Sequence, residues 1–342
     1  MKIIIAILAI LLMIILHEWG HFIAARLCKV PVYEFSVGMG PLIKQGISKK
    51  GTKISLRAIP IGGYCAFDDT QNASFEDAAL ETISPLKKIF ICFMGPFMNL
   101  LTAYIILIGI TAIVGKVGPL NHVESTMKGF PAENVLQQDD IITEINGIKI
   151  DEENTVAKFV DESEGNPLTI KFLRNNEEIT AVIAPIIDES AGDYKIGINY
   201  KNDYVKATPL EIFTVPFKNC INFGKTIFNG LKMIITRKAK SSEISGIVGV
   251  VSIMSEYATR DAVIKFLNIM ALISINLGIV NLLPIPALDG AKILTGIYEM
   301  IFKRKIPRKI EENAAFYCFI LLMFIMVLTF INDIINIINK IL

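Results

Sequence analysis

Four stretches of the chain are apolar and long enough to cross a lipid bilayer: Ile3–Leu27, Ile89–Val114, Phe266–Leu283 and Ala314–Ile335. A transmembrane helix needs about 20 predominantly apolar residues. The second and fourth stretches carry no charge before Asp333, which argues against buried helices of a soluble protein. The pattern therefore predicts a polytopic α-helical membrane protein with four transmembrane helices.

Lysine and arginine gather in two of the polar stretches between these spans. One is the loop 26–88, and the other immediately precedes the fourth span. Short loops rich in Lys and Arg are retained on the cytoplasmic side of a membrane. We therefore expect both termini, and the long segment between the second and third spans, to be extracytoplasmic.

The first basic loop also contains a strand pattern. Residues Lys53–Ile59 alternate polar and apolar side chains, residues Tyr33–Val37 can pair with them, and Lys50-Gly51 supplies a turn. One interpretation is a small surface hairpin. The other is a sheet whose free edge accepts an extended peptide, with Ile54 and Leu56 as candidate substrate-binding residues.

From about residue 115 to 200 the composition becomes that of a soluble α+β module, with two strands predicted around the Asn146-Gly147 turn. Residues 209–238 form an amphipathic pattern, which predicts a helix broken near Gly224 that lies on the membrane surface. A fifth span is the alternative, and it would invert the topology after it. The domains we predict are 1–114, 115–200, 201–262 and 263–342.

Composition narrows the class further. The chain is 52% hydrophobic with a mean hydropathy of +0.51, which is too apolar for an ordinary soluble domain. A formal net charge of +1 is not the excess of positive charge that is typical of a nucleic-acid-binding protein. The five cysteines are odd in number and have no CxxC spacing, which favours free thiols.

The sequence His17-Glu18-Trp19-Gly20-His21 lies inside the first span. Ionisable residues at that depth indicate a functional site by default. On a helix, His17 and His21 lie on one face and can bind one Zn²⁺, while Glu18 can accept a proton from a water molecule at the metal. The alternative is two core histidines and a capped glutamate, but an unpaired Glu in a membrane is costly.

A catalytic zinc usually has three protein ligands and one open position. Asp289 is the natural third candidate, because it follows the third span after the helix-breaking Pro284 and Pro286. Irregular backbone at membrane depth is tolerated only against protein or a water-filled cavity. Asn99, the polar exception in the second span, forms either an interhelical hydrogen bond or a contact to the metal site.

With these residues the chain resembles the site-2 protease family of intramembrane zinc metalloproteases, in its bacterial RseP-like branch. His17–His21 resembles the HExxH helix, Phe35–Gly40 the GxG loop, and Leu56–Tyr64 the cytoplasmic membrane-reentrant β-hairpin. Two further segments match: Met94–Asn99 resembles the GPxxN helix, and Asn281–Gly290 the NxxPxPxLDG segment.

The middle module is similar to a single PDZ domain, which the resemblance makes an inserted extracytoplasmic PDZ-like α+β domain. It departs from the pattern at Gln138-Asp139-Asp140, where a glycine is expected before the strand. Ser245–Gly249 resembles the SGPxG stretch, with Ile247 in place of proline. We expect this domain to exclude bulky ectodomains rather than to capture C-termini.

The resemblance implies roles for individual residues. Glu18 is the catalytic base, and His17, His21 and Asp289 hold Zn²⁺. The remaining candidates are substrate-binding residues: Asn281, Asn99, Gly38, Gly40, Ile54 and Leu56.

The implied activity is hydrolysis within or near the transmembrane segments of single-span membrane proteins, in a bacterial inner membrane. Such substrates include anti-sigma factors, after a first protease has trimmed their ectodomains, and leftover signal peptides. A catalytically silent membrane chaperone or scaffold, and a zinc-dependent transporter, are the alternatives. A silent chaperone or scaffold would need a broken catalytic motif. A zinc-dependent transporter would need polar residues along several spans.

Overall fold

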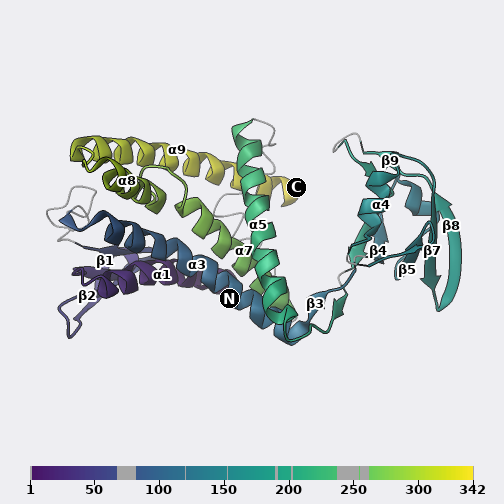
Figure 1. Cartoon of the computed structure of the whole chain (residues 1–342), viewed down its shortest axis with the longest axis horizontal. Coiled ribbons are helices and arrows are strands. Elements are labelled where there is room, and N and C mark those ends of the chain that lie inside the picture. Colours follow the sequence, from purple (N-terminus) through teal and green to yellow (C-terminus); the bar gives the residue numbers. More distant parts are fainter. Residues whose placement is uncertain are drawn as a thin grey trace. The chain divides into compact units, whose positions relative to one another are not determined.

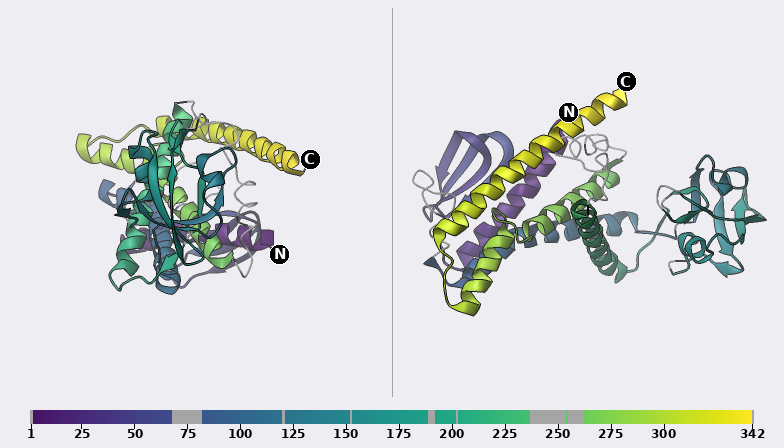
Figure 2. Two further views of the ribbon diagram at one scale, coloured as in Figure 1. Left: turned by 90° about the vertical axis from the view of Figure 1, so that its right-hand side faces the viewer. Right: turned by 90° about the horizontal axis from the view of Figure 1, so that it is seen from above.

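A computed structural model of the protein describes residues 2–67, 82–119, 121–151, 153–188, 192–201, 203–236, 254 and 262–341. The chain divides into two compact units (Figure 1, Figure 2). Met1–Ile110 and Pro216–Leu342 form the first unit, and Thr111–Val215 forms the second. The segment Ser245–Gly249, which resembles the SGPxG stretch, lies outside the described residues.

Long apolar helices make up most of the first unit, as the hydropathy pattern predicts. Four helical stretches in the described part of the chain are long and apolar enough to span a membrane, namely Lys2–Leu27, Pro85–Val114, Val263–Asn281 and Lys309–Ile331. The corresponding helices are α1 (Lys2–Leu27), α3 (Pro85–Val114), α7 (Val263–Asn281) and α9 (Arg308–Ile341). The short helix α8 (Asp289–Phe302) lies between α7 and α9 along the chain.

Helix α8 is joined to the start of α3 by a buried ion pair. The Lys88 ammonium lies 3.2 Å from Glu299 Oε1, and both side chains are less than a tenth exposed. Gly296 of α8 permits this approach, because a Cβ added there would lie 2.8 Å from Cγ1 of Ile89. The pair therefore fixes the helix whose first residue is Asp289.

Strands β1 (Glu34–Ile47) and β2 (Lys53–Ala66) are long and bent, and each pairs with the other more than once. Residues 53–56 pair with 44–47 on one side and in parallel with 34–37 on the other. Residues 63–66 pair with 34–37 alone among the described residues. The edge prediction for Ile54 and Leu56 is therefore wrong: both lie in a central strand, and the outer strands of the sheet are 63–66 and 42–47.

Helix α5 (Glu211–Ile235) is continuous, so the predicted break near Gly224 is also wrong. Gly224 is buried and a Cβ there would contact Ile279 Cδ1 at 3.4 Å, which accounts for the glycine by close packing. Exposed phenylalanines lie along one stripe of α5, and Lys218, Lys225 and Lys232 form another. The helix is therefore amphipathic, as predicted, and it is not among the described helices that qualify as candidate spans.

The second unit is built on a six-stranded antiparallel sheet of order β11-β4-β5-β7-β8, with β6 paired to β5. Its strands are β11 (Ile198–Lys201), β4 (His122–Thr126), β5 (Ile141–Ile145), β6 (Ile148–Lys149), β7 (Leu168–Arg174) and β8 (Glu177–Ile183). The remaining elements are the 3-10 helix η1 (Pro131–Asn134), α4 (Val156–Glu162), and the short strands β3 (Lys116–Val117), β9 (Ile186–Ile187), β10 (Tyr194–Lys195) and β12 (Tyr204–Val205).

This unit has its own apolar core, centred on Ile142, Ile170 and Phe172. Asn146 and Gly147 both have positive φ, as the predicted turn between β5 and β6 requires. Nδ1 of His122 donates to the Asp203 carboxylate at 2.7 Å, and His122 belongs to no group of potential metal ligands among the described residues. The unit thus folds around a core of its own.

Candidate metal centre

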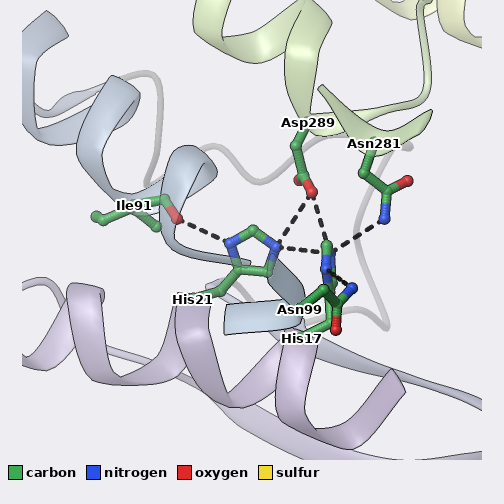
Figure 3. A network of polar contacts seen from close by, with 6 residues as sticks. All are labelled: His17, His21, Ile91, Asn99, Asn281 and Asp289. Atoms are coloured by element: carbon green, nitrogen blue, oxygen red, sulfur yellow. Dashed lines mark hydrogen bonds and ion pairs between the residues drawn. The ribbon is translucent and has the colours of Figure 1, made fainter. Parts of the chain in front are cut away.

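Three potential metal ligands converge in the first unit, from residues far apart in the sequence (Figure 3). Nε2 of His17 lies 3.2 Å from Nε2 of His21, and the two nitrogens lie 3.1 and 3.4 Å from Oδ2 of Asp289. Both histidines are less than a tenth exposed. The histidines come from α1 and the aspartate from the first residue of α8, as the sequence predicts.

The spacing of these three atoms fits a tetrahedral zinc. Nitrogen and oxygen ligands lie about 2.0–2.2 Å from Zn²⁺, so two corners of a tetrahedron are separated by about 3.3–3.6 Å. Three lone pairs at 3.1–3.4 Å repel one another unless a proton or a metal cation lies between them. No cysteine belongs to this cluster among the described residues.

The outer nitrogen of His21 is fixed by backbone. Nδ1 lies 2.8 Å from the carbonyl oxygen of Ile91 and can only donate to it, which leaves the lone pair of Nε2 for a metal. A buried carbonyl from α3 thus selects the tautomer that a zinc ligand needs.

The outer nitrogen of His17 faces the amide of Asn99, which is completely buried in α3. Nδ2 of Asn99 lies 3.0 Å from Nδ1 of His17, and Oδ1 of Asn99 has no hydrogen-bond partner. Exchanging the two amide atoms would let Oδ1 accept from Nδ1–H, which satisfies the oxygen and frees Nε2 for the metal. Asn99 therefore supports a ligand, and its predicted contact with substrate is wrong because it is 0% exposed.

Three glycines allow the helices to approach closely enough for this cluster. A Cβ on Gly20 would lie 2.3 Å from the carbonyl oxygen of Met94, and one on Gly95 would lie 2.2 Å from Nε2 of His21. A Cβ on Gly290, next to Asp289, would lie 2.2 Å from the carbonyl oxygen of Leu283. Any larger residue at these positions would push a ligand out of place.

Glu18 borders the same cavity without belonging to the ligand cluster. The cavity has a volume of about 480 Å³ and is lined by the three ligands, Glu18 and Asn281. The backbone N–H of Cys65 donates to the Glu18 carboxylate. The edge strand 63–66 thus holds the Glu18 carboxylate at the wall of the cavity that the three ligands also line.

Asn281, at the end of α7, lies on the wall of this cavity. Its Nδ2 is 3.4 Å from Nε2 of His17. An amide at this position can donate to an oxygen atom held next to the metal. Gly38 and Gly40 do not line the cavity; their φ angles of +83° and +80° let β1 bend, which is a role in the shape of the sheet.

A buried polar cluster stabilises the sheet beside the cavity. Arg57 donates from Nη2 to Glu34 at 2.9 Å and from Nη1 to the carbonyl of Gly40 at 2.9 Å. Burial alone would raise the pKa of Glu34, but hydrogen bonds from Ser55, Arg57 and Tyr64 outweigh burial and lower that pKa. Tyr64, which also lines the cavity, is held by this cluster.

Sequence reasoning missed several residues of the site. Tyr64, Cys65, Ile91 and Lys292 line the cavity. Ile91 acts through its carbonyl, so its side chain gave no signal. Tyr64 and Cys65 lie beyond the alternating Lys53–Ile59 pattern, which therefore gave no signal for them. Lys292 lies one helical turn beyond Asp289, and that spacing could have indicated it.

Replacing Asn99 by leucine, which has a similar size, tests its support of His17. We expect the affinity for zinc to fall about 10- to 100-fold, because outer hydrogen bonds to metal ligands are worth that much. Asn99→Asp keeps an acceptor for Nδ1–H and should restore affinity. Affinity is measured by competition with a chelator. Equal affinity of the leucine and wild-type proteins would contradict this role.

Known proteins match nearly the whole chain, including the candidate metal centre. The sequence model of Peptidase family M50 matches residues 5–325. A Campylobacter jejuni protein named "Putative zinc metalloprotease Cj1068" is 34% identical over 354 residues, which cover 98% of this chain and 93% of the relative. A Clostridium perfringens protein of the same descriptive name is 34% identical over 337 residues, which cover 98% of this chain and 99% of the relative.

Among solved structures, the chain is similar to the PDZ domain of an SdrC-like protein from Listeria monocytogenes. The match has 27% sequence identity and a TM-score of 0.22, and it covers 23% of this chain and 85% of that one. The corresponding PDZ domain from Listeria innocua matches at 26% identity with a TM-score of 0.23, over 25% of this chain and 98% of that one.

Proposed function

The chain belongs to Peptidase family M50 and is a zinc metalloprotease, and we propose that it cleaves single-span membrane proteins within or near their transmembrane segments. The observation that carries this proposal is the position of the ligand cluster. His17 and His21 lie in the second half of α1, an apolar candidate span, and Glu18 lies between them. A protease whose site is built into such a helix reaches peptide bonds that soluble proteases do not.

The reaction needs a Lewis acid and a base. Zinc held by His17, His21 and Asp289 would polarise the scissile carbonyl and acidify the attacking water. Glu18 accepts the proton from that water and returns it to the leaving amine. Asn281 donates to the carbonyl oxygen as negative charge develops on it, which stabilises the transition state.

A helical substrate must unwind before attack, because its carbonyls are already hydrogen-bonded and its peptide bonds are shielded. The edge strand 63–66 adjoins Glu18 and, among the described residues, pairs with another strand on one side only. We propose that the unwound segment binds along this edge by strand addition. The strand that includes Ile54 and Leu56 is central in the sheet and does not bind the substrate in this way. Helix-destabilising Gly, Pro, Asn or Ser near the cut should favour cleavage.

Strand addition predicts an alternating response to N-methylation of the substrate. In an antiparallel or parallel ladder, successive N–H groups point to opposite sides. N-methyl groups placed one at a time along a synthetic substrate should therefore slow cleavage at every second position. The readout is the initial rate for each peptide. A uniform response along the segment would contradict binding by strand addition.

The substrates and setting follow from the same proposal. We propose anti-sigma factors and remnant signal peptides as substrates, cleaved after a first protease has removed the ectodomain. We also propose the bacterial inner membrane as the location, with both termini and the second unit extracytoplasmic and the basic loop 26–88 cytoplasmic. The second unit then acts as a PDZ-like size filter for intact ectodomains.

Cleavage in proteoliposomes tests the proposal. A designed single-span substrate is reconstituted with the protein, and the cut is located by mass spectrometry. We expect a cut within or next to the apolar span, loss of cleavage after chelation, and recovery when zinc is returned. A membrane scaffold would leave the substrate intact, and a cut confined to soluble tails would contradict intramembrane proteolysis.

A further inference from the structure

A second cavity of about 420 Å³ adjoins the metal cavity in the first unit. Helices α8 and α9 and the loop before α8 form its walls. The α9 side includes Ile310, Ala315 and Phe319. Most of this lining is apolar, and the two alanines Ala314 and Ala315 leave the space that larger residues would fill. We refer to this cavity as the α8–α9 groove.

The groove and the metal cavity share a wall. Ala287, Leu288 and Lys292 line both cavities. Leu288 and Lys292 flank the metal ligand Asp289 in sequence. A substrate peptide that runs past the ligand cluster and along this shared wall therefore enters the α8–α9 groove.

The shared wall presents unpaired backbone groups. Neither the N–H nor the carbonyl of Ala287 has a hydrogen-bond partner among the residues that the structure describes. Its φ angle of +78° is unusual for a residue with a side chain. Strained backbone of this kind persists where the surrounding structure enforces it, and it often marks a binding site.

We propose that the α8–α9 groove binds the apolar chain of the substrate on one side of the cleaved bond, in extended form. This inference rests on the proposed proteolysis. The backbone of Ala287 hydrogen-bonds the substrate backbone as it leaves the metal cavity, and the apolar side chains that follow pack between Ile310, Ala315 and Phe319. The groove thereby selects for large apolar residues on that side of the cut.

The polar groups of the groove favour a peptide over a lipid chain as occupant. An acyl chain would cover the Ala287 N–H and carbonyl without bonding them, and burying such groups unpaired is costly. Lys292 and Glu311 also line the groove. An extended peptide supplies both the acceptors and donors for the backbone and the apolar side chains for the walls.

Filling the groove tests the proposal. In Ala315→Trp we expect cleavage of the reconstituted substrate to fall on the order of tenfold or more, because displacement of a bound chain by even an ångström is costly to the rate. Zinc content should stay at the wild-type level, since no ligand is touched. Leu321→Trp is the matched control on the same helix, at a position that is 55% exposed and outside the groove lining.

A second measurement identifies the occupant. A photo-crosslinking amino acid replaces Phe319 in the Glu18→Gln protein, with Phe324 as the control position, since it is 60% exposed and outside the groove. We expect a crosslink to substrate, near the cut and on one side of it only, from position 319 and none from position 324. Wild-type cleavage rates in Ala315→Trp, or crosslinks from position 319 to lipid alone, would overturn the proposal. Absence of cleavage by the wild-type protein would instead contradict the proposed function.

Discussion

Replacing Glu18 by glutamine is expected to abolish peptide hydrolysis while zinc remains bound. Glutamine has the same shape and its carbonyl can still accept the Cys65 N–H, so the site should keep its form. It cannot accept a proton from water. Because Glu18 serves both proton transfers, we expect turnover to fall by about 10²–10⁴-fold or more.

The measurement is the initial rate of cleavage in proteoliposomes, together with the zinc content of each protein. Trp19→Phe is the control, because Trp19 is the neighbouring residue, is 45% exposed and lines neither cavity. It should cleave at close to the wild-type rate. Substantial turnover by Glu18→Gln with full zinc would exclude Glu18 as the base.

Replacing Asp289 by asparagine should remove zinc and activity together. The carboxylate is the charged member of the cluster, and the amide oxygen of asparagine is a much weaker ligand. We expect zinc affinity to fall by more than the factor of about 10 to 100 that hydrogen bonds to the outer atoms of metal ligands contribute. Asparagine keeps the shape of the side chain at the start of α8, so the helix should still form.

Zinc affinity is again measured by competition with a chelator, alongside the rate of cleavage. Asp151→Asn, at an exposed position of the second unit, is the control and should keep both values. Full zinc occupancy and full activity in Asp289→Asn would show that the third ligand lies elsewhere.

The three residues of the candidate metal centre could be predicted from the sequence, because local periodicity and depth in an apolar segment indicate them. A helix places His17 and His21 on one face whatever its neighbours are. Asp289 follows helix-breaking prolines at the end of a span, where a carboxylate needs a partner. The long apolar helices could be predicted for the same reason, since hydropathy alone indicates them.

Contacts between distant segments could not be predicted in the same way. Alternation predicts a strand over residues 53–59 but does not indicate which strands lie on either side of it, and Ile54 and Leu56 are central although the pattern is also compatible with an edge. The Lys88–Glu299 pair joins residues 211 positions apart, and nothing in either local pattern indicates the other.

Asn99 shows a further limit. A polar residue in a span indicates a partner, but the choice between another helix, the metal site and a substrate depends on how α3 packs against α1. The structure resolves that choice, because the side-chain amide of Asn99 faces His17, while its backbone carbonyl oxygen accepts from Oγ of Ser274 in α7 at 2.8 Å. Asn99 therefore hydrogen-bonds to a predicted metal ligand and is too deeply buried to contact a substrate.

X-ray absorption at the zinc edge of the purified Glu18→Gln protein tests the metal centre most directly. The ligands assigned here are two nitrogens and one oxygen, whereas Cys65 and Cys92 line the same cavity and could provide sulfur. We predict one zinc per chain with nitrogen and oxygen scatterers alone, at about 2.0–2.2 Å. A sulfur scatterer at about 2.3 Å, or no bound zinc, would contradict the assignment of His17, His21 and Asp289 as the metal site.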